Sequence, residues 1–277
     1  MFSPTGEIVE AARAAGVGVG AFNVITVEHA EAIVAGAEAA GCPVVLQISE
    51  NAVKFHGGRL EPIAAAARRV AELSSVRVGL HLDHVESDEL FDLAAPNGFG
   101  SAMYDASKLP YDTNVAATKH AVLRGHAAGL WVESELGEVG GKDGAHAPGA
   151  RTDPAEAAAY VAATGVDALA VAVGSSHAMT TRTAALDHAL IAQLHAAVPV
   201  PLVLHGSSGV PDDELRAAVR GGLLKINIGT ALNVAFTGAV RVALDDPSVV
   251  DPRRYLKAAR AAMAETVTRS LRVVTQL

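Results

Sequence analysis

The sequence predicts a (β/α)8 TIM barrel, a closed ring of eight parallel strands that are each followed by a helix. Short apolar runs rich in valine, isoleucine and leucine recur along the chain and alternate with segments of helical periodicity. Eight such runs occur in 277 residues, which is close to the length of about 250 residues that is typical of such a barrel. Half of the residues are hydrophobic but only 4% are aromatic, which suits buried parallel strands and alanine-rich helices.

The eight expected strands are apolar runs bounded by glycine, proline, aspartate or serine. In chain order they are Val19 to Asn23, Val44 to Ile48, Val78 to Leu82, Ser101 to Tyr104, Leu130 to Glu135, Ala168 to Val173, Leu202 to Leu204 and Leu224 to Ile228. Good helix formers at helical spacing lie between them. The expected helices are Val27 to Ala40, Leu60 to Leu73, Thr113 to Ala128, Pro154 to Ala163, Ala185 to Ala197 and Pro211 to Arg220.

The chain contains no linker and no change of composition, so we expect one domain over residues 1–277 with a C-terminal helical extension after Asp251. The extension is rich in alanine and is expected to cover the barrel exterior or a neighbouring subunit. The longest irregular stretch, Leu136 to Arg151, contains five glycines and predicts a loop at the active site.

Composition also restricts the possible partners and the compartment. The single Cys42 rules out an internal disulfide framework and favours a reducing, cytoplasmic setting. The first residues lack a basic segment followed by an apolar core, and no apolar run has membrane-spanning length, so we expect neither export nor a membrane partner. A net charge of −8 argues against nucleic acid, although a small phosphorylated ligand stays possible.

Polar side chains follow every expected strand at its carboxyl end. They are Asn23, Gln47, Ser49, Asp83, His84, Asp105, Glu133, Glu135, Ser175, Ser176, His177, His205 and Asn227. Barrel active sites form at this face, so these residues are expected to converge although they lie far apart in sequence.

Three of these residues, His84, His177 and His205, provide the ligand set of a catalytic zinc site, three imidazoles with one open position. Asp83 is adjacent, as a proton-transferring carboxylate would be. The alternative is that the histidines are structural and that Asp83 caps the next helix. The turns after the seventh and eighth strands, Gly206 to Gly209 and Asn227 to Thr230, lie where barrels bind phosphate.

These residues occur in motifs that resemble the class II, metal-dependent ketose-bisphosphate aldolases, with the closest likeness to the tagatose-bisphosphate type. The motifs run in family order over nearly the whole chain. They are Ala21-Phe22-Asn23, His81-Leu82-Asp83-His84, Tyr104-Asp105-Ala106-Ser107, Glu133-Ser134-Glu135-Leu136-Gly137, Val173-Gly174-Ser175-Ser176-His177, Leu204-His205-Gly206-Ser207-Ser208-Gly209, Lys225-Ile226-Asn227 and Asp251-Pro252-Arg253.

The resemblance implies reversible cleavage of a ketose 1,6-bisphosphate into dihydroxyacetone phosphate and an aldehyde such as glyceraldehyde 3-phosphate. It implies zinc on the three histidines, an alternative metal position at Asp105 and Glu135, and a possible Na⁺ or K⁺ ion. Asp83 is implied to exchange the proton of the C4 hydroxyl, and Asp143 to move a proton at the substrate carbon. The implied assembly is a homodimer or homotetramer.

The resemblance also implies a set of substrate contacts, with Arg253 reaching the distal phosphate, often across a subunit interface. The implied contacts are Asn23, Ser49, Ala178, Gly206, Ser208, Asn227, Thr230 and Arg253. The chain departs from the family pattern at three positions, with Ala178 in place of glycine, Lys108 in place of histidine and Asp143 in place of glutamate. These departures leave open a non-catalytic sugar-phosphate-binding relative, or an aldolase for a different, deoxy ketose phosphate.

Two other enzyme classes stay open on the residues alone. Lys225 in the eighth strand raises a Schiff-base aldolase, although its place near the start of the strand argues against this. A metal hydrolase barrel uses the same ligand types, but no second histidine pairs with His84 in a His-x-His motif. The pattern does not distinguish the fructo from the tagato configuration, or zinc from cobalt or manganese.

Overall fold

A computed structural model describes residues 1–136 and 151–276. Eight parallel strands form a closed barrel in sequence order, and the last strand pairs with the first, which confirms the predicted fold. The strands are β1 (Val19–Asn23), β2 (Val44–Ser49), β3 (Val78–Val85), β4 (Ser101–Tyr104), β5 (Trp131–Glu135), β6 (Ala168–Ala170), β7 (Leu202–Leu204) and β8 (Leu223–Ile228).

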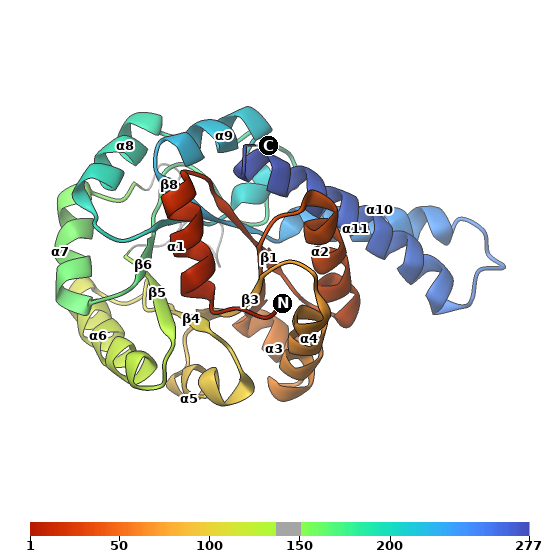
Figure 1. The fold of residues 1–277 in the computed structure, drawn as a ribbon, viewed down its shortest axis with the longest axis horizontal. Helices are drawn as coiled ribbons and strands as arrows, with labels where there is room; N and C mark the ends of the chain where they lie inside the picture. Colours follow the sequence, from red (N-terminus) through yellow and green to blue (C-terminus); the bar gives the residue numbers. More distant parts are fainter. Residues whose placement is uncertain (137–150, 277) are drawn as a thin grey trace.

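Helices cover the barrel, most of them in a ring around its outer side (Figure 1). They are α1 (Thr5–Ala15), α2 (Val27–Ala40), α3 (Glu50–Phe55), α4 (Glu61–Leu73), α5 (Asp88–Asp92), α6 (Tyr111–Ala127), α7 (Pro154–Thr164), α8 (His188–Ala197), α9 (Asp212–Arg220), α10 (Thr230–Ala243) and α11 (Pro252–Val274), with short 3-10 helices η1 (Ala95–Asn97) and η2 (Ser207–Gly209). Within the described ranges, no helix combines the length and the apolar character needed to cross a bilayer.

The main hydrophobic core lies between the outer face of the barrel and the helices. Strand residues such as Phe22 and Leu80 are fully buried there, together with the inner faces of α2 and α11. Gly36 of α2 allows a close approach, because a Cβ at this position would lie 2.7 Å from Val267 of α11. The second half of α11 therefore packs on the barrel exterior, as expected for the C-terminal extension.

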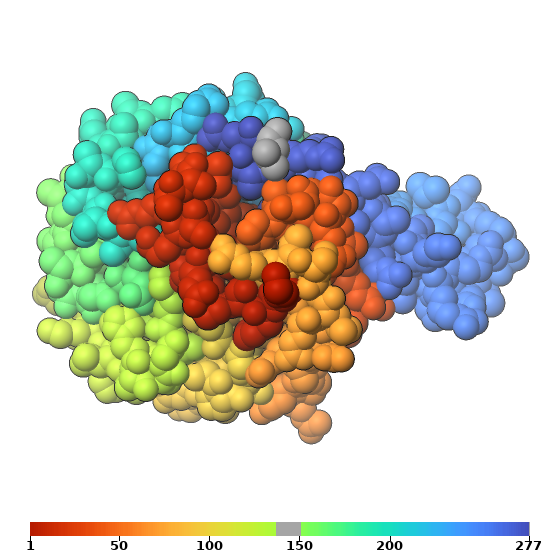
Figure 2. Space-filling view, in the orientation of Figure 1, coloured from red at the N-terminus to blue at the C-terminus, as the bar shows by residue number. Residues whose placement is uncertain are grey.

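Two features lie outside the ring of helices. The short helix α1 crosses the end of the barrel that faces the viewer in Figure 1, where Ile8 and Val9 are buried and Ser3 pairs with Val78. At the other extreme, α10 and the beginning of α11 form a hairpin that projects from the body of the molecule, as Figure 2 shows. Since α1 covers one end of the barrel, the site forms at the other end, where the carboxyl ends of the strands lie.

The observed boundaries differ from the predicted ones mainly around β3 and β6. β3 continues to Val85, and its register with β4 shifts between Leu82 and Val85. β6 ends at Ala170, so His177 lies in the following loop rather than at a strand end. The next helix begins at His188, because the Asp187 side chain accepts the Leu190 N–H and caps it. Helices α1, α3, α5 and α10 were not predicted.

Candidate active site

A cavity of about 370 Å³ opens at the carboxyl ends of the strands, where barrel enzymes place their sites. It takes residues from the ends of β1, β2, β3, β7 and β8 and from the loops and helices that follow them. Its lining is Asn23, Ile25, Gln47, Ser49, Asn51, Ala52, Phe55, Asp83, His84, His177, Ala178, His205, Gly206, Ser208, Asn227, Gly229, Thr230 and Asn233.

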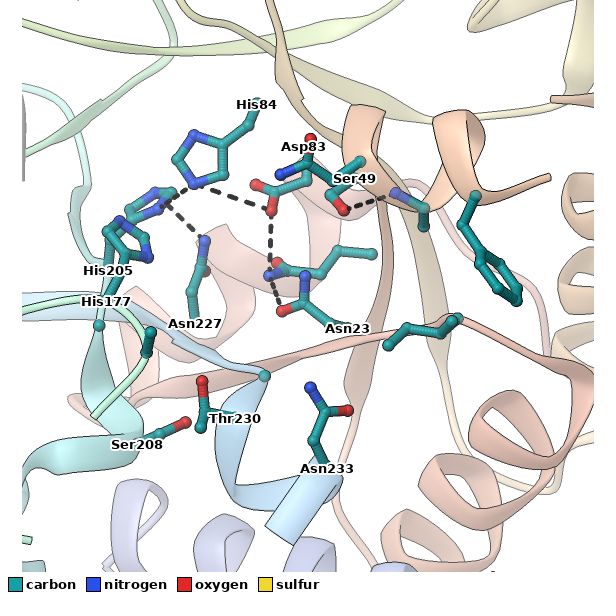
Figure 3. A pocket seen from close by; sticks show the side chains of 18 residues that line it. Asn23, Ser49, Asp83, His84, His177, His205, Ser208, Asn227, Thr230 and Asn233 are labelled. Atoms are coloured by element: carbon teal, nitrogen blue, oxygen red, sulfur yellow. Dashed lines mark hydrogen bonds and ion pairs between the residues drawn. The ribbon is translucent and has the colours of Figure 1, made fainter. Parts of the chain in front are cut away.

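Three imidazoles meet on one side of this cavity (Figure 3). One ring nitrogen from each of His84, His177 and His205 lies within 4.8 Å of the other two. The His84 Nε2 and His205 Nδ1 atoms are 2.9 Å apart. Nitrogens that share a zinc ion at about 2.0–2.1 Å lie slightly further apart than this, so a small outward movement of the rings would admit the metal. The donor set therefore fits a zinc-type ion.

Two of these rings are held from behind by buried carboxylates. Asp105 Oδ2 lies 2.8 Å from His84 Nδ1, and Glu133 Oε1 lies 3.1 Å from His205 Nε2. Metal-binding histidines generally direct their second nitrogen to such a partner, which fixes the ring. The arrangement is typical of a metal centre.

A second possible ligand group shares His84 with the first. His84, Asp105 and Glu135 each place one ligand atom within 4.8 Å of the others, and both carboxylates are buried. This group lies behind the cavity wall, because neither Asp105 nor Glu135 is among the lining residues. The two groups would use different nitrogens of His84, since Nε2 faces His205 and Nδ1 faces Asp105.

Asp83 lies beside the histidines and is 1% exposed. Burial alone would raise the pKa of its carboxyl, but the neighbouring His84, His205 and Lys225 lower it below its usual value. Gln47 donates to Asp83 Oδ2 over 3.4 Å and to Asn23 Oδ1 over 2.9 Å, which fixes this edge of the cavity. Asp83 is thus available as an ionised proton acceptor.

The backbone at the site adopts conformations that side chains normally avoid. His84 has φ 51° and Ala178 has φ 59°, both in the left-handed region. In His84 this follows the irregularity after Leu82 and turns the ring toward the cavity. Gly206 has φ 68°, and a Cβ there would lie 2.6 Å from the backbone of Ser176, so only glycine fits.

Below the histidines in Figure 3, the cavity is bounded by a helix N-terminus and a glycine-containing turn. Thr230 begins α10, and Ser208 in η2 accepts the Ala231 N–H at 3.1 Å. Figure 3 shows Ser208 and Thr230 facing the same space. Hydroxyls, backbone N–H groups and the positive end of a helix are a recurrent anion site.

Comparison with known proteins agrees with this geometry. The model of the family described as fructose-bisphosphate aldolase class-II matches residues 3–276. The chain belongs to the class II fructose-bisphosphate aldolase family. A fructose-bisphosphate aldolase of Thermus caldophilus is 38% identical, with 94% of each chain covered, and one of Geobacillus stearothermophilus is 38% identical, with 92% of this chain and 90% of the relative covered.

Solved structures of aldolases share the whole fold. The YdjI aldolase of Escherichia coli K12 matches with a TM-score of 0.85 at 31% identity, covering 99% of this chain and 97% of its own. A putative fructose-1,6-bisphosphate aldolase of Coccidioides immitis gives a TM-score of 0.83 at 25% identity, with the same coverage. The resemblance to class II aldolases is thereby confirmed, and the special likeness to the tagatose type stays a prediction.

The structure of this class II aldolase brings most of the predicted site residues together. Asp83, the three histidines and seven of the predicted substrate contacts line the cavity, whereas Asp105 and Glu135 lie just behind it. Arg253 does not line it; its side chain is 89% exposed and pairs with Asp251 at the start of α11. Asp143 lies outside the described residues.

Several lining residues were not predicted as site residues, namely Ile25, Asn51, Ala52, Phe55 and Asn233. Gln47, near the end of β2, was among the polar strand-end residues expected to converge, and it lines the cavity. Asn51 and Asn233 lie in the first turns of α3 and α10, which follow β2 and β8 directly. Polar residues in the helix turn after a barrel strand are the signal that could have found them.

The Schiff-base alternative does not fit the aldolase structure. Lys225 is fully buried inside the barrel and does not line the cavity. Its Nζ lies 2.8 Å from Glu133 Oε2, so it is held as an ammonium group without a free electron pair. Lys225 is therefore not positioned to attack a substrate carbonyl.

His81 lies below the cavity and gives the folded aldolase a sensitivity to acid. Its ring is fully buried, Nδ1 lies 2.8 Å from Ser101 Oγ, and burial, assisted by the charge of Lys225, lowers its pKa to about 3. The unfolded chain takes up a proton here below about pH 6.5, whereas the folded chain does not. Above that pH, His81 does not reduce the free energy of unfolding. As the pH falls toward 3, the free energy of unfolding decreases by up to ~1.4 kcal/mol per pH unit.

We therefore expect His81→Gln to make the free energy of unfolding depend less steeply on pH between about pH 6.5 and 4.5. The decrease in slope should correspond to close to one proton. Urea unfolding at several pH values measures this slope. His195→Gln is the matched control, since this ring is exposed and should not produce the effect. An unchanged slope in His81→Gln would show that the buried, uncharged His81 ring does not cause the loss of stability in acid.

Proposed function

We propose that this class II aldolase cleaves a ketose 1,6-bisphosphate reversibly to dihydroxyacetone phosphate and glyceraldehyde 3-phosphate, with residues 1–277 acting as one catalytic domain. The observation that carries the proposal is the convergence of three histidine nitrogens beside the buried Asp83, in a cavity that Ser208 and Thr230 also line. The names of the relatives favour fructose 1,6-bisphosphate as the first substrate to test.

The proposed metal is zinc, bound by His84, His177 and His205, with Asp105 and Glu135 as an alternative position. When bound, it supplies a Lewis acid that withdraws electron density from the substrate carbonyl. A Na⁺ or K⁺ ion is a further part of the proposal. The carboxylates of Asp105 and Glu133, which lie beside His84 and His205, would orient these two rings for metal binding.

The proton steps fall to the chain's own carboxylates. Asp83 takes the C4 hydroxyl proton as the bond between C3 and C4 breaks, so that C4 becomes the aldehyde carbonyl, and it returns the proton in condensation. Asp143 is proposed to exchange the proton at C3. Gly206, Ser208, Asn227 and Thr230 bind the C1 phosphate end, and Asn23, Ser49 and Ala178 complete the substrate contacts.

The substrate's C4 configuration is tested by steady-state kinetics. We expect cleavage of fructose 1,6-bisphosphate and tagatose 1,6-bisphosphate to differ in kcat/KM, because Asp83 contacts the C4 hydroxyl directly in the proposed arrangement. Binding of either compound without cleavage by the zinc-loaded protein would instead support a non-catalytic sugar-phosphate-binding role.

Arg253 is proposed to act in the site of a second subunit. It lies at the start of α11, on the projecting hairpin of Figure 1, and its guanidinium is 89% exposed. Among the described residues, no lysine or arginine lines this chain's own cavity. A homodimer, or a homotetramer of such dimers, would supply the missing cation to the distal phosphate.

We expect Arg253→Ala to lower kcat/KM for the bisphosphate by about 10- to 100-fold. Co-expression with Asp83→Ala then tests the partner's role, because half of randomly formed dimers would be hybrids with one intact site. The expected mixture has about a quarter of wild-type activity. Activity no greater than the sum of the two variants would contradict a site shared between subunits.

A further inference from the structure

The interior of the barrel contains a fully buried ion pair that the proposed reaction does not use. Glu133 on β5 and Lys225 on β8 are both 0% exposed, and neither lines the cavity. Their charged atoms, Lys225 Nζ and Glu133 Oε2, are 2.8 Å apart. Burying two charges is costly and often stabilises less than apolar residues of the same volume would. A pair in this position therefore suggests a purpose other than stability.

Both members of the pair are connected to the same metal-site histidine. Glu133 Oε1 lies 3.1 Å from His205 Nε2. Lys225 Nζ donates to Asn227 Oδ1 at 2.9 Å, and Asn227 Nδ2 lies 3.2 Å from His205 Nε2. Glu133 and Asn227 thus compete for one nitrogen of His205, and Lys225 contacts both of them.

The charge of Glu133 decides this competition. A carboxylate only accepts hydrogen bonds, and an unprotonated Nε2 facing it would be repelled. His205 therefore carries its proton on Nε2 and donates it to Glu133. Its Nδ1 is left with a free electron pair and is the nitrogen that lies 2.9 Å from His84 Nε2, where the histidines converge.

Lys225 explains how the carboxylate stays charged in a dry interior. It neutralises Glu133 on the oxygen that does not face His205, and it keeps the Asn227 amide turned with Oδ1 toward itself. We propose that the Glu133–Lys225 pair is a positioning device that fixes the tautomer and orientation of His205 for metal binding. The proposal rests on the zinc site of the proposed function.

The experiment replaces the two charges together, so that neither is left buried alone. Glu133→Leu/Lys225→Met removes the acceptor from His205, and Glu133→Gln/Lys225→Met returns a neutral acceptor of nearly the same shape. Zinc affinity is measured by competition with a chelating dye, and the stability of the metal-free protein by urea unfolding. We expect zinc affinity to fall about 10- to 100-fold in the leucine variant and about 3- to 10-fold in the glutamine variant.

The expected result differs from that of a merely structural pair. The urea midpoint of the metal-free leucine variant should equal or exceed that of wild type, although its zinc affinity falls. Val267→Ala is the converse control, because it should lower the midpoint by opening the core between α2 and α11 but leave zinc affinity unchanged.

Zinc affinity within twofold of wild type in a folded leucine variant would overturn the proposal. If that variant does not fold, unchanged affinity in the glutamine variant overturns it equally. A wild-type protein that binds no zinc would instead refute the proposed function and the positioning role with it, so the two failures are distinguishable.

Discussion

Asp83→Asn is expected to lower kcat for ketose-bisphosphate cleavage by about 10²- to 10⁴-fold, the usual contribution of a positioned general base. Asparagine keeps the size of the side chain but cannot take the C4 proton. Steady-state cleavage, followed by coupled detection of the aldehyde, measures the loss. The bound zinc should stay at wild-type level, since Asp83 is not one of the three converging ligands.

The surroundings of Asp83 make this substitution a clean test. The residue is 1% exposed and receives a hydrogen bond of 3.4 Å from Gln47. Asparagine can still accept that bond through its side-chain oxygen. Asp112→Asn, a change of an exposed carboxylate in the first turn of α6, controls for the loss of one negative charge. A fully active Asp83→Asn enzyme would exclude this residue as the proton acceptor.

The second large effect is expected from removal of the metal. Dialysis against a chelator should abolish cleavage, and stoichiometric zinc should restore it, because the Lewis acid cannot be replaced by the imidazoles alone. His177→Ala should reproduce the loss and should not be rescued by stoichiometric zinc, since two imidazoles with an open third position bind zinc more weakly.

His188→Ala is the matched control for the histidine substitution. This ring lies at the first residue of α8 and pairs with Glu214, away from the cavity. It should leave both the zinc content and the activity unchanged. Cleavage that survives complete metal removal would contradict a metal-dependent mechanism in this chain.

Much of the barrel and its chemistry could be predicted because the parallel strands are short apolar runs bounded by glycine, proline, aspartate or serine. The apolar run Val78 to Leu82 is visible in the sequence, and Asp83 and His84, which come next, form the last part of β3 together with Val85. The strand-end rule therefore selected residues that the fold brings together. It also reached His205, which directly follows β7.

The rest depended on geometry that no local pattern encodes. His177 was selected as a ligand, but its expected place at a strand end was wrong, because it lies in a loop seven positions after the end of β6, beside Ala178 with its positive φ. The Glu133–Lys225 pair requires the closed barrel, since β5 and β8 are separated by 87 residues in sequence and by two strands in the ring. The direction of Arg253 depends on how α10 and α11 pack, which periodicity does not specify.

The central claim is that His84, His177 and His205 jointly bind zinc beside Asp83. X-ray absorption at the zinc edge, on protein loaded with one equivalent of zinc, tests it most directly. We predict three imidazole nitrogens at about 2.0–2.1 Å with a further light-atom ligand, and the loss of one imidazole in His177→Ala. A zinc ion with fewer than three imidazoles, or an unchanged spectrum in His177→Ala, would contradict the account.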